Sequence, residues 1–240
     1  MPQRTDDHMM EPLSDARIVD AWQRNAAAWT VAVRDGQIES RRLVTDRAIV
    51  DAVLARQPRS VLDLGCGEGW LARALSGHGM TVTGTDVVPR LIEQAQQAGG
   101  GDFRVLSYAD IGAGVLDLRV DAVVCNFSLF GKESVEQLLA AIPALLQLGG
   151  TLLIQTLHPL AACGEQPYRD GWRQGSWAGF SADFTDPAPW YFRTMEGWTR
   201  LLSSCGLDRI ELREPLHPKT GKPASAIFIA SQSRPVHEPG

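Results

Sequence analysis

The residues with the clearest chemical potential lie in one stretch, from Val61 to Trp70, where an apolar segment runs into a glycine-rich turn, V-L-D-L-G-C-G-E-G-W. Glycine lets the backbone approach a ligand where a Cβ would clash, and the helix expected next offers unpaired N–H groups and a positive dipole end. Asp86 ends the following apolar segment, about 20 residues after Gly65, which is the spacing that places a carboxylate against both hydroxyls of a ribose. The stretch therefore predicts a site for an adenosine derivative.

Two residues discriminate between adenosine derivatives. A dinucleotide-binding turn has a third glycine where this chain has Trp70, and that glycine normally lets the helix pack close to the strand. Asp63 would repel a pyrophosphate, but it favours a cation or an amine that donates hydrogen bonds. S-adenosylmethionine carries a sulfonium and an α-amino group, so the two residues favour it. An NAD(P)-dependent oxidoreductase is the alternative that uses the same sheet.

The rest of the chain predicts the elements that position these residues. Apolar segments alternate with amphipathic helical patterns, as in a doubly wound α/β sheet. The expected strands are residues 61–64, 81–86, 103–106, 122–127, 151–156, 207–213 and 224–231. In the helix after the fourth strand, Ser134 and Gln137 predict a capping box, and Pro143 predicts a kink or break.

The glycine-rich stretch resembles the first motif of the class I S-adenosylmethionine-dependent methyltransferases, and the resemblance extends over roughly Ile38 to Gln232. It implies a Rossmann-like seven-stranded methyltransferase sheet with helices on both faces, in which the last two strands form a hairpin and the final strand inserts antiparallel. It also implies S-adenosyl-L-methionine as cofactor, S-adenosyl-L-homocysteine as product and a small-molecule methyl acceptor. A non-catalytic S-adenosylmethionine-binding module is a second alternative.

The resemblance assigns cofactor-binding roles at the ends of four strands. In the family the glycine turn holds the amino-acid end of the cofactor, the acid after the second strand holds the ribose, and the acid after the third lies near the adenine. Residues after the fourth strand contact cofactor or substrate. The matching positions are Asp63, Gly65, Cys66 and Gly67, then Asp86 and Val87, then Ala109, Asp110 and Ile111, then Asn126 and Phe127. Capping a turn or helix is the alternative role of each acid.

The segment that begins at Asn126 departs from one subgroup of the family. It lacks the Asn/Asp-Pro-Pro-Tyr motif of methyltransferases that act on planar amino groups of adenine or glutamine. This departure disfavours a nucleobase or protein-amide acceptor. The oxygen, nitrogen and carbon atoms of small molecules all stay open as methylation sites.

Two helices expected before the first strand supply further candidates. Trp29 lies on an apolar stripe at helical spacing, where it either covers the cofactor or packs in the core. A helix from about Glu39 places Arg42 on a largely apolar face, where an unpaired charge is costly. Its partner is either Asp46 or the methionine carboxylate of the cofactor, which a guanidinium binds with two hydrogen bonds.

The connection from Leu160 to Arg193 is long, at 34 residues, and it holds eight of the 17 aromatic residues of the chain. After the fifth strand it would overhang the carboxyl ends of the strands, where α/β sheets bind ligands. We interpret it as a substrate lid for a partly apolar acceptor, with a small extra core or a homodimer contact as the alternative. His158 ends the fifth strand there and is the candidate catalytic base, or else a loop histidine held by local hydrogen bonds.

Length and composition set the outer limits. The 240 residues, 44% of them hydrophobic, suffice for one α/β domain with additions. We expect a flexible N-terminus over 1–14, a helical cap over 15–57, the methyltransferase domain over 58–233 with its lid at 160–193, and a flexible tail over 234–240.

Charge and cysteine content limit the partners. A net charge of −5 does not favour nucleic acid, which is bound by basic surface. The four cysteines lack metal-ligand spacing, which predicts reduced thiols and no metal. The chain has no apolar run long enough to span a membrane and a polar start without a signal-peptide pattern, so we expect a cytoplasmic protein with no membrane partner.

Overall fold

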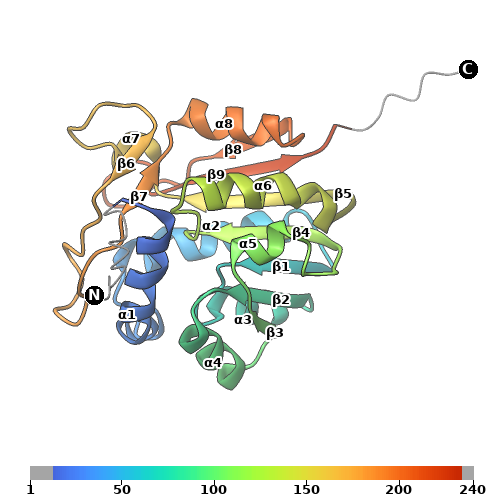
Figure 1. The fold of residues 1–240 in the computed structure, drawn as a ribbon, viewed down its shortest axis with the longest axis horizontal. Helices are drawn as coiled ribbons and strands as arrows, with labels where there is room; N and C mark the ends of the chain where they lie inside the picture. Colours follow the sequence, from blue (N-terminus) through green and yellow to red (C-terminus); the bar gives the residue numbers. More distant parts are fainter. Residues whose placement is uncertain (1–12, 234–240) are drawn as a thin grey trace, which may run out of the picture.

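A seven-stranded sheet organises the computed structural model, which describes residues 13–233 (Figure 1). Its strand order is β3-β2-β1-β4-β5-β9-β8. The strands are β1 (Ser60–Leu64), β2 (Thr81–Asp86), β3 (Asp102–Val105), β4 (Val120–Asn126), β5 (Leu146–Thr156), β8 (Arg209–Arg213) and β9 (Ala226–Ser231). The first five are parallel, whereas β9 runs antiparallel to both β5 and β8. The predicted Rossmann-like sheet with an antiparallel terminal hairpin is confirmed.

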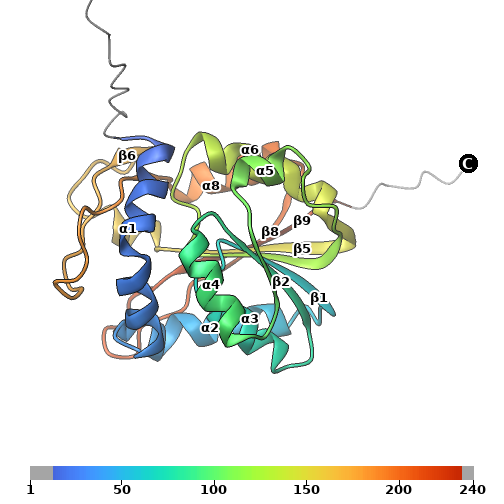
Figure 2. The same ribbon diagram turned by 60° about the horizontal axis from the view of Figure 1, so that its bottom comes forward.

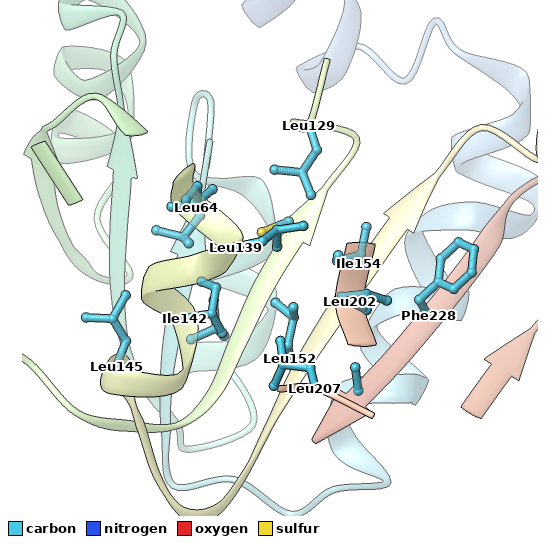
Figure 3. Packing of buried hydrophobic residues seen from close by; sticks show 14 of the residues in the cluster. Leu64, Leu129, Leu139, Ile142, Leu145, Leu152, Ile154, Leu202, Leu207 and Phe228 are labelled. Atoms are coloured by element: carbon cyan, nitrogen blue, oxygen red, sulfur yellow. The ribbon is translucent and has the colours of Figure 1, made fainter. Parts of the chain in front are cut away.

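Helices cover both faces of the sheet (Figure 2). One face carries α2 (Asp46–Leu54), α3 (Trp70–Ser76) and α4 (Pro89–Ala98), and the other carries α5 (Tyr108–Gly112), α6 (Glu133–Leu145) and α8 (Met195–Ser204). Because side chains alternate along a strand, Val61 packs in the cluster under α2 and α3, while Leu62 and Leu64 pack in the cluster under α6 and α8. Figure 3 shows this second cluster, in which Leu139 and Ile142 of α6 lie near Leu152 and Ile154 of β5.

The topology places a ligand crevice at one edge of the sheet. From β1 the chain proceeds outward to β2 and β3, and it then returns to the other side of β1 to form β4 and β5. At such a reversal the connections leave the carboxyl ends of two neighbouring strands in opposite directions, which opens a crevice between them. The ends of β1 and β4 are therefore where a ligand is expected.

The remaining elements lie around this crevice. They are α1 (Asp15–Arg34), the π-helix η1 (Arg41–Thr45), the short α7 (Pro159–Ala162) and a two-stranded ribbon of β6 (Gly171–Arg173) and β7 (Trp190–Phe192). Figures 1 and 2 show α1 and the long connection around β6 and β7 at the same end of the molecule. The connection thus lies near the carboxyl ends of the strands, as the sequence predicted.

The start of α6 corrects one prediction. Ser134 and Gln137 do not form a capping box, because the helix begins at Glu133 and its N-cap, Lys132, makes no side-chain cap. Instead Asp15 of α1 accepts hydrogen bonds from the backbone N–H groups of Lys132 and Ser134, at 2.8 and 2.6 Å. Pro143 also fails to break α6, which continues to Leu145 and leads directly into β5.

We expect Asp15→Ala to lower the free energy of unfolding by about 1–2 kcal/mol, because it leaves two N–H groups at the start of α6 without an acceptor. Ser134→Ala is the matched control and should change stability far less, since the Ser134 hydroxyl caps nothing at this helix start. Urea unfolding followed by circular dichroism measures both. Equal losses in the two variants would mean that Asp15 is not the cap.

Two predictions extend beyond what the structure describes. Most of the predicted flexible N-terminus and all of the predicted flexible tail, residues 1–12 and 234–240, lie outside the described residues. Among the helices between them, none is long and apolar enough to cross a membrane.

Candidate functional site

The glycine turn after β1 adopts a backbone that only glycine takes without strain. Gly65, Gly67 and Gly69 have φ angles of +72°, +57° and +83°. The Gly65 and Cys66 N–H groups both donate to the Thr85 carbonyl, at 2.8 and 2.9 Å, which fastens the turn to β2. The turn is therefore a fixed structural feature of the crevice.

Glu68 anchors the same turn, a role that the sequence did not reveal. Its buried carboxylate accepts two hydrogen bonds of 2.7 Å from Arg73 Nη2 of α3 and one of 3.0 Å from Arg34 Nε at the end of α1. A buried carboxylate with two guanidinium partners resists displacement, because moving it would leave a charge without compensation. The turn is thus tied to both α1 and α3.

Asp86 lies at the end of β2 beside the glycine turn, as predicted. Its two carboxylate oxygens accept hydrogen bonds of 2.9 Å from the N–H groups of Gly67 and Val88. Burial raises the pKa of Asp86, and these two hydrogen bonds oppose that rise. Val87 and Trp29 both pack against a small buried cluster of Ala26, Val88 and Leu91 between α1 and α4.

Asp63 is buried at the carboxyl end of β1, where its Oδ2 atom has no hydrogen-bond partner within the described part of the chain. Burial, with a smaller contribution from the negative charge of Asp86, raises the pKa of Asp63 to about 7. An unpartnered buried carboxyl is costly, so its presence indicates a donor that arrives with a ligand.

The structure corrects the prediction that Arg42 lies on a buried face. In η1 the Asp46 N–H bonds to the Arg41 carbonyl, and this wider π-helical turn shifts the register relative to an α-helix. As a result Arg42 is exposed, and Arg41 is 8% exposed on the same face as Thr45. A π-turn produces no regular spacing of apolar residues. The sequence pattern therefore predicted that Arg42 was buried, whereas its neighbour Arg41 is.

Arg41 has the Asp46 partner that the sequence offered to Arg42. Its Nε donates to Asp46 at 2.9 Å, and its guanidinium carbon lies 4.7 Å from the ring centre of Trp70 and 5.8 Å from that of Trp29. Among the described residues its buried Nη2 finds no acceptor. The indole Nε1 of Trp29 in turn lies 3.6 Å from where a Cβ on Gly67 would stand, so Trp29 lies over the glycine turn.

In the described part of the chain six buried side-chain polar atoms have no partner, and besides Thr85 Oγ1 of β2 the other five come from elements that meet at the crevice. They belong to η1 and to the ends of β1, β4 and β5: Arg41 Nη2, Thr45 Oγ1, Asp63 Oδ2, Asn126 Oδ1 and Gln155 Oε1. We call these five atoms the polar row. Buried polar groups are nearly always hydrogen-bonded, so a set of this size points to a ligand with both donors and acceptors.

The segment after β3 holds the three residues that the family resemblance places near the adenine. The Asp110 carboxylate is exposed and accepts hydrogen bonds from the Ser107 N–H and hydroxyl, at 2.9 and 2.7 Å, in a capping box that also lowers its pKa. Ile111 packs in the core under α6, and Ala109 lies in the first turn of α5 between Tyr108 and Asp110. Asp110 therefore has the capping role that was its alternative, while contact of these three residues with an adenine stays a prediction.

Tyr108 lies beside the glycine turn, a position that the sequence did not reveal. Its buried hydroxyl donates to the Ser128 carbonyl at 3.1 Å and lies 2.9 Å from where a Cβ on Gly65 would stand. Burial raises the pKa of Tyr108 well above its ordinary value. Any side chain at Gly65 would also overlap Ser128, so the glycine is required here by packing as well as by φ.

A second, apolar cavity adjoins the end of β4. Its volume is about 20 Å³, room for about one water molecule. Its walls come from the loop after β4, the end of β5, β7 and α8, and they include Phe127, Phe130, Thr156, Trp190, Tyr191 and Trp198. Phe127 has a φ of +51°, a conformation uncommon outside glycine, and its N–H donates to the Gln155 carbonyl at 2.8 Å. Such strain is often stored at functional sites.

His158 lies beside this cavity rather than in its wall. Leu157 and Pro159 line the cavity, whereas the ring of His158 is buried with Nε2 2.8 Å from Glu214 Oε1. A carboxylate that holds an imidazole is the arrangement of an oriented base, and it is also an ordinary structural pair. The catalytic role of His158 therefore stays a prediction.

Within the described residues, the cysteines and acids form neither a reactive thiolate nor a metal site. Burial raises the pKa of the Cys66 and Cys125 thiols, so both are protonated near the glycine turn and β4. No cluster of three or more His, Cys, Asp or Glu side chains suited to a metal ion occurs in residues 13–233.

Comparison with known proteins places these features in a family. Residues 39–212 match the family described as "Methyltransferase domain". The chain is 34% identical over 114 residues to the ubiquinone biosynthesis O-methyltransferase of Xanthomonas campestris, covering 45% of this chain and 47% of that protein. It is 35% identical over 103 residues to the enzyme of the same name from Xylella fastidiosa, covering 41% and 42%. The chain thus spans about half the length of these curated relatives.

Solved structures share the fold at lower identity. The 1,6-didemethyltoxoflavin-N1-methyltransferase of Burkholderia thailandensis, solved with 1,6-didemethyltoxoflavin and S-adenosylhomocysteine, aligns with a TM-score of 0.61 at 19% identity over 97% of this chain and 99% of its own. An S-adenosylmethionine-dependent methyltransferase from Mesorhizobium loti aligns with a TM-score of 0.57 at 21% identity, covering 75% and 95%.

Proposed function

The chain belongs to the class I S-adenosylmethionine-dependent methyltransferases, and on that premise we propose that it transfers a methyl group from S-adenosyl-L-methionine to an oxygen, nitrogen or carbon atom of a small, partly apolar molecule. The curated relatives are named as O-methyltransferases and one structural neighbour as an N-methyltransferase, so the acceptor atom stays open. An NAD(P)-dependent oxidoreductase is not favoured by any of these similarities.

The polar row is the observation that carries the proposal, because it fits the amino-acid end of the cofactor. The ionised Asp63 carboxylate and the amide oxygens of Asn126 and Gln155 are acceptors for an α-ammonium group. Arg41 Nη2 is a buried cationic donor for a carboxylate. A dinucleotide has no ammonium group to match this set of acceptors.

The other cofactor contacts of the proposal follow from the neighbouring elements. Asp86 would accept hydrogen bonds from the ribose hydroxyls, Trp29 would cover the glycine turn, and the turn itself would approach the methionine chain closely at Gly65 and Gly67. The cofactor supplies an electrophilic methyl group on a sulfonium. The tasks of the protein are to align the acceptor with that methyl and to exclude water.

The acceptor part of the proposal rests on the apolar cavity. Its aromatic walls suit an apolar or planar molecule at the end of β4. If the acceptor must lose a proton, His158, oriented by Glu214, is the proposed base. A cytoplasmic location, residues 15–57 as a cap, and the absence of nucleic-acid and membrane partners belong to the same proposal.

Calorimetric titration of the full chain with S-adenosylhomocysteine, and separately with NADH, tests the cofactor class. We expect saturable micromolar binding of S-adenosylhomocysteine and none of NADH. Binding of NADH alone would overturn the proposal. Binding of S-adenosylhomocysteine without turnover across a broad panel of small acceptors would favour the non-catalytic binding module.

Asp86→Ala should weaken S-adenosylhomocysteine binding by roughly 1.5–3 kcal/mol, because it removes the charged acceptor for the ribose hydroxyls. Asp102→Ala is the matched control, since Asp102 is an exposed strand aspartate paired with Arg104. The same titration measures both variants. Unchanged affinity in Asp86→Ala would contradict the ribose assignment.

A further inference from the structure

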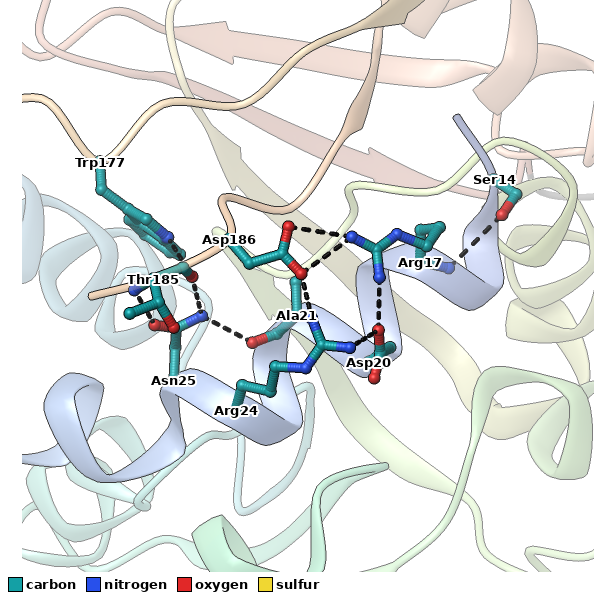
Figure 4. Close-up of polar contacts among 9 residues, drawn as sticks. All are labelled: Ser14, Arg17, Asp20, Ala21, Arg24, Asn25, Trp177, Thr185 and Asp186. Carbon is teal, nitrogen blue, oxygen red and sulfur yellow. Dashed lines mark hydrogen bonds and ion pairs between the residues drawn. The ribbon is translucent and has the colours of Figure 1, made fainter. Parts of the chain in front are cut away.

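The tip of the long connection, residues 177–186, is fastened to α1; we call this segment the lid tip. Asn25 of α1 is fully buried and binds the backbone of Thr185 twice, with Nδ2 donating to the carbonyl at 2.7 Å and Oδ1 accepting from the N–H at 2.8 Å (Figure 4). The Trp177 indole also donates to the Thr185 carbonyl at 3.0 Å. Asn25 thus pairs with both backbone polar groups of Thr185.

Charges reinforce the same junction. The Asp186 carboxylate accepts from Arg17 Nη2 at 2.8 and 2.9 Å and also from Arg24, while Asp20 pairs with the same two arginines (Figure 4). The four side chains are 22–47% exposed, so solvent and salt weaken each pair. Asp186 has a φ of +46°, a conformation that is uncommon outside glycine.

Aromatic contacts connect the lid tip to both parts of the proposed site. The ring of Trp22 on α1 lies 5.7 Å from Trp177 of the lid tip, 5.7 Å from Phe130 in the cavity wall and 5.1 Å from Trp29. Trp29 in turn lies over Gly67. Helix α1 therefore contacts the lid tip and the cavity wall through Trp22, and it carries Trp29 over the glycine turn.

The size of the cavity requires its walls to move before an acceptor enters, and one wall residue, Phe130, contacts Trp22 of α1. About 20 Å³ is much smaller than any organic acceptor. The exposed ion pairs are weak enough to break and reform, while the buried Asn25 contact gives the closed state a defined register. A segment held in this way suits opening and closing on the timescale of turnover.

We propose that Asn25 and Asp186 form a latch that holds the lid tip closed on α1 and couples closure of the acceptor cavity to occupancy of the cofactor site. The coupling rests on the proposed function, whereas the latch itself does not. Asn25 and Asp186 are positioning residues in this scheme, since neither reaches the cavity wall.

Limited digestion of the full-length protein with chymotrypsin tests the latch, because the lid tip offers Trp177, Phe180 and Phe184 as cleavage sites. Without ligand, Asn25→Ala should be cleaved about tenfold faster than the natural chain, since it loses two hydrogen bonds to Thr185. Asp186→Asn should be cleaved a few-fold faster, and raising the salt concentration should accelerate cleavage of the natural chain but not of this variant. Mass spectrometry assigns the cut sites.

Asp51→Asn is the matched control, because it removes a carboxylate from an exposed pair with Arg47 on α2. It should be cleaved at the natural rate. Saturating S-adenosylhomocysteine should slow cleavage of the natural lid tip several-fold and have much less effect in Asn25→Ala. Because Ala favours helix, α1 should persist in that variant, and circular dichroism verifies this.

Two outcomes would each overturn one part of the proposal, and two further outcomes decide which measurement tests it. Natural cleavage rates in both latch variants would overturn the latch, and equal protection by S-adenosylhomocysteine in the natural chain and Asn25→Ala would overturn the coupling. If Asn25→Ala does not fold, Asp186→Asn decides the test. The latch then requires that cleavage of Asp186→Asn does not depend on salt. If the calorimetry shows no S-adenosylhomocysteine binding, the proposed function fails, while the ligand-free comparison still decides the latch.

Discussion

Asp63→Asn is expected to abolish measurable cofactor binding and, at the same time, to stabilise the ligand-free protein at pH 7 and above. The binding loss should exceed about a hundredfold, because the variant removes the negative charge that faces the α-ammonium group inside a buried site. The gain in stability follows from the same burial. Asp63 thus serves ligand binding and lowers the stability of the ligand-free fold.

The sign of the stability effect follows from the pKa of Asp63. In the folded protein it is raised from 3.8 to about 7, so between those values the folded state keeps a proton that the unfolded state has lost. Stability therefore falls as pH rises through this window, and the full cost, of order 4 kcal/mol at most, is present above pH 7. A neutral amide has no such cost.

Urea unfolding at several values between pH 5 and 8.5, with calorimetry at each, measures both effects. Asp121→Asn is the matched control with the opposite sign, because hydrogen bonds from the Arg59 and Ser60 N–H groups lower the pKa of Asp121. That variant should lose stability at neutral pH. An Asp63→Asn protein that is less stable than the natural chain at pH 8, or that binds S-adenosylhomocysteine normally, would contradict the assignment.

The affinity of the natural chain should depend on pH for the same reason. Since an ammonium ligand favours the ionised carboxyl, binding displaces the proton from Asp63, and affinity should fall as pH decreases below about 7. The slope approaches tenfold per pH unit at most. A flat affinity profile between pH 5.5 and 8 would mean that Asp63 does not face the ammonium group.

Arg41→Ala should weaken S-adenosylhomocysteine binding by about 30- to 100-fold, whereas Arg42→Ala should leave it within about twofold. Arg41 has the buried Nη2 without an acceptor among the described residues, and Arg42 is exposed. A charge-assisted hydrogen bond contributes roughly 1.5–3 kcal/mol, which corresponds to the expected loss. The two variants are neighbours with the same change in net charge, so a general electrostatic effect would alter both.

Truncating the ligand completes the test of Arg41. 5′-Methylthioadenosine lacks the amino and carboxylate groups, so Arg41→Ala should not alter its binding. Calorimetry with both ligands and both variants gives the interaction directly. If Arg41→Ala weakens binding of the two ligands equally, Arg41 acts through the position of η1 and not on the carboxylate.

The sheet and the glycine turn could be predicted because their signals are local. Each strand appears as an apolar segment, and the turn requires glycine at φ values that other residues avoid. The spacing of Asp86 from the turn follows from the length of one helix between two parallel strands. Pattern, length and chemistry therefore all indicate the same sheet and the same turn.

The features that could not be predicted depend on contacts distant in sequence or on irregular helix. Asp15 caps a helix 117 residues away at Lys132, so no local motif encodes the cap. Arg41 and not Arg42 is buried because a π-turn shifts the register. The junction of Asn25 with Thr185 joins residues 160 positions apart. Local patterns give the elements of this site, and packing between distant segments determines which side chains face it.

The position of β9 between β5 and the edge strand β8 has a consequence for how the protein is made. Leu153 of β5 pairs with Ile229, about 75 residues later in the chain, and both are buried. Translation of the residues between these strands takes several seconds, and during that time the apolar edge of β5 has no partner strand. Open edges of this kind recruit strands from other chains. The yield of folded protein therefore depends on what shields the nascent chain during those seconds, and we expect a fragment that ends before β9 to aggregate.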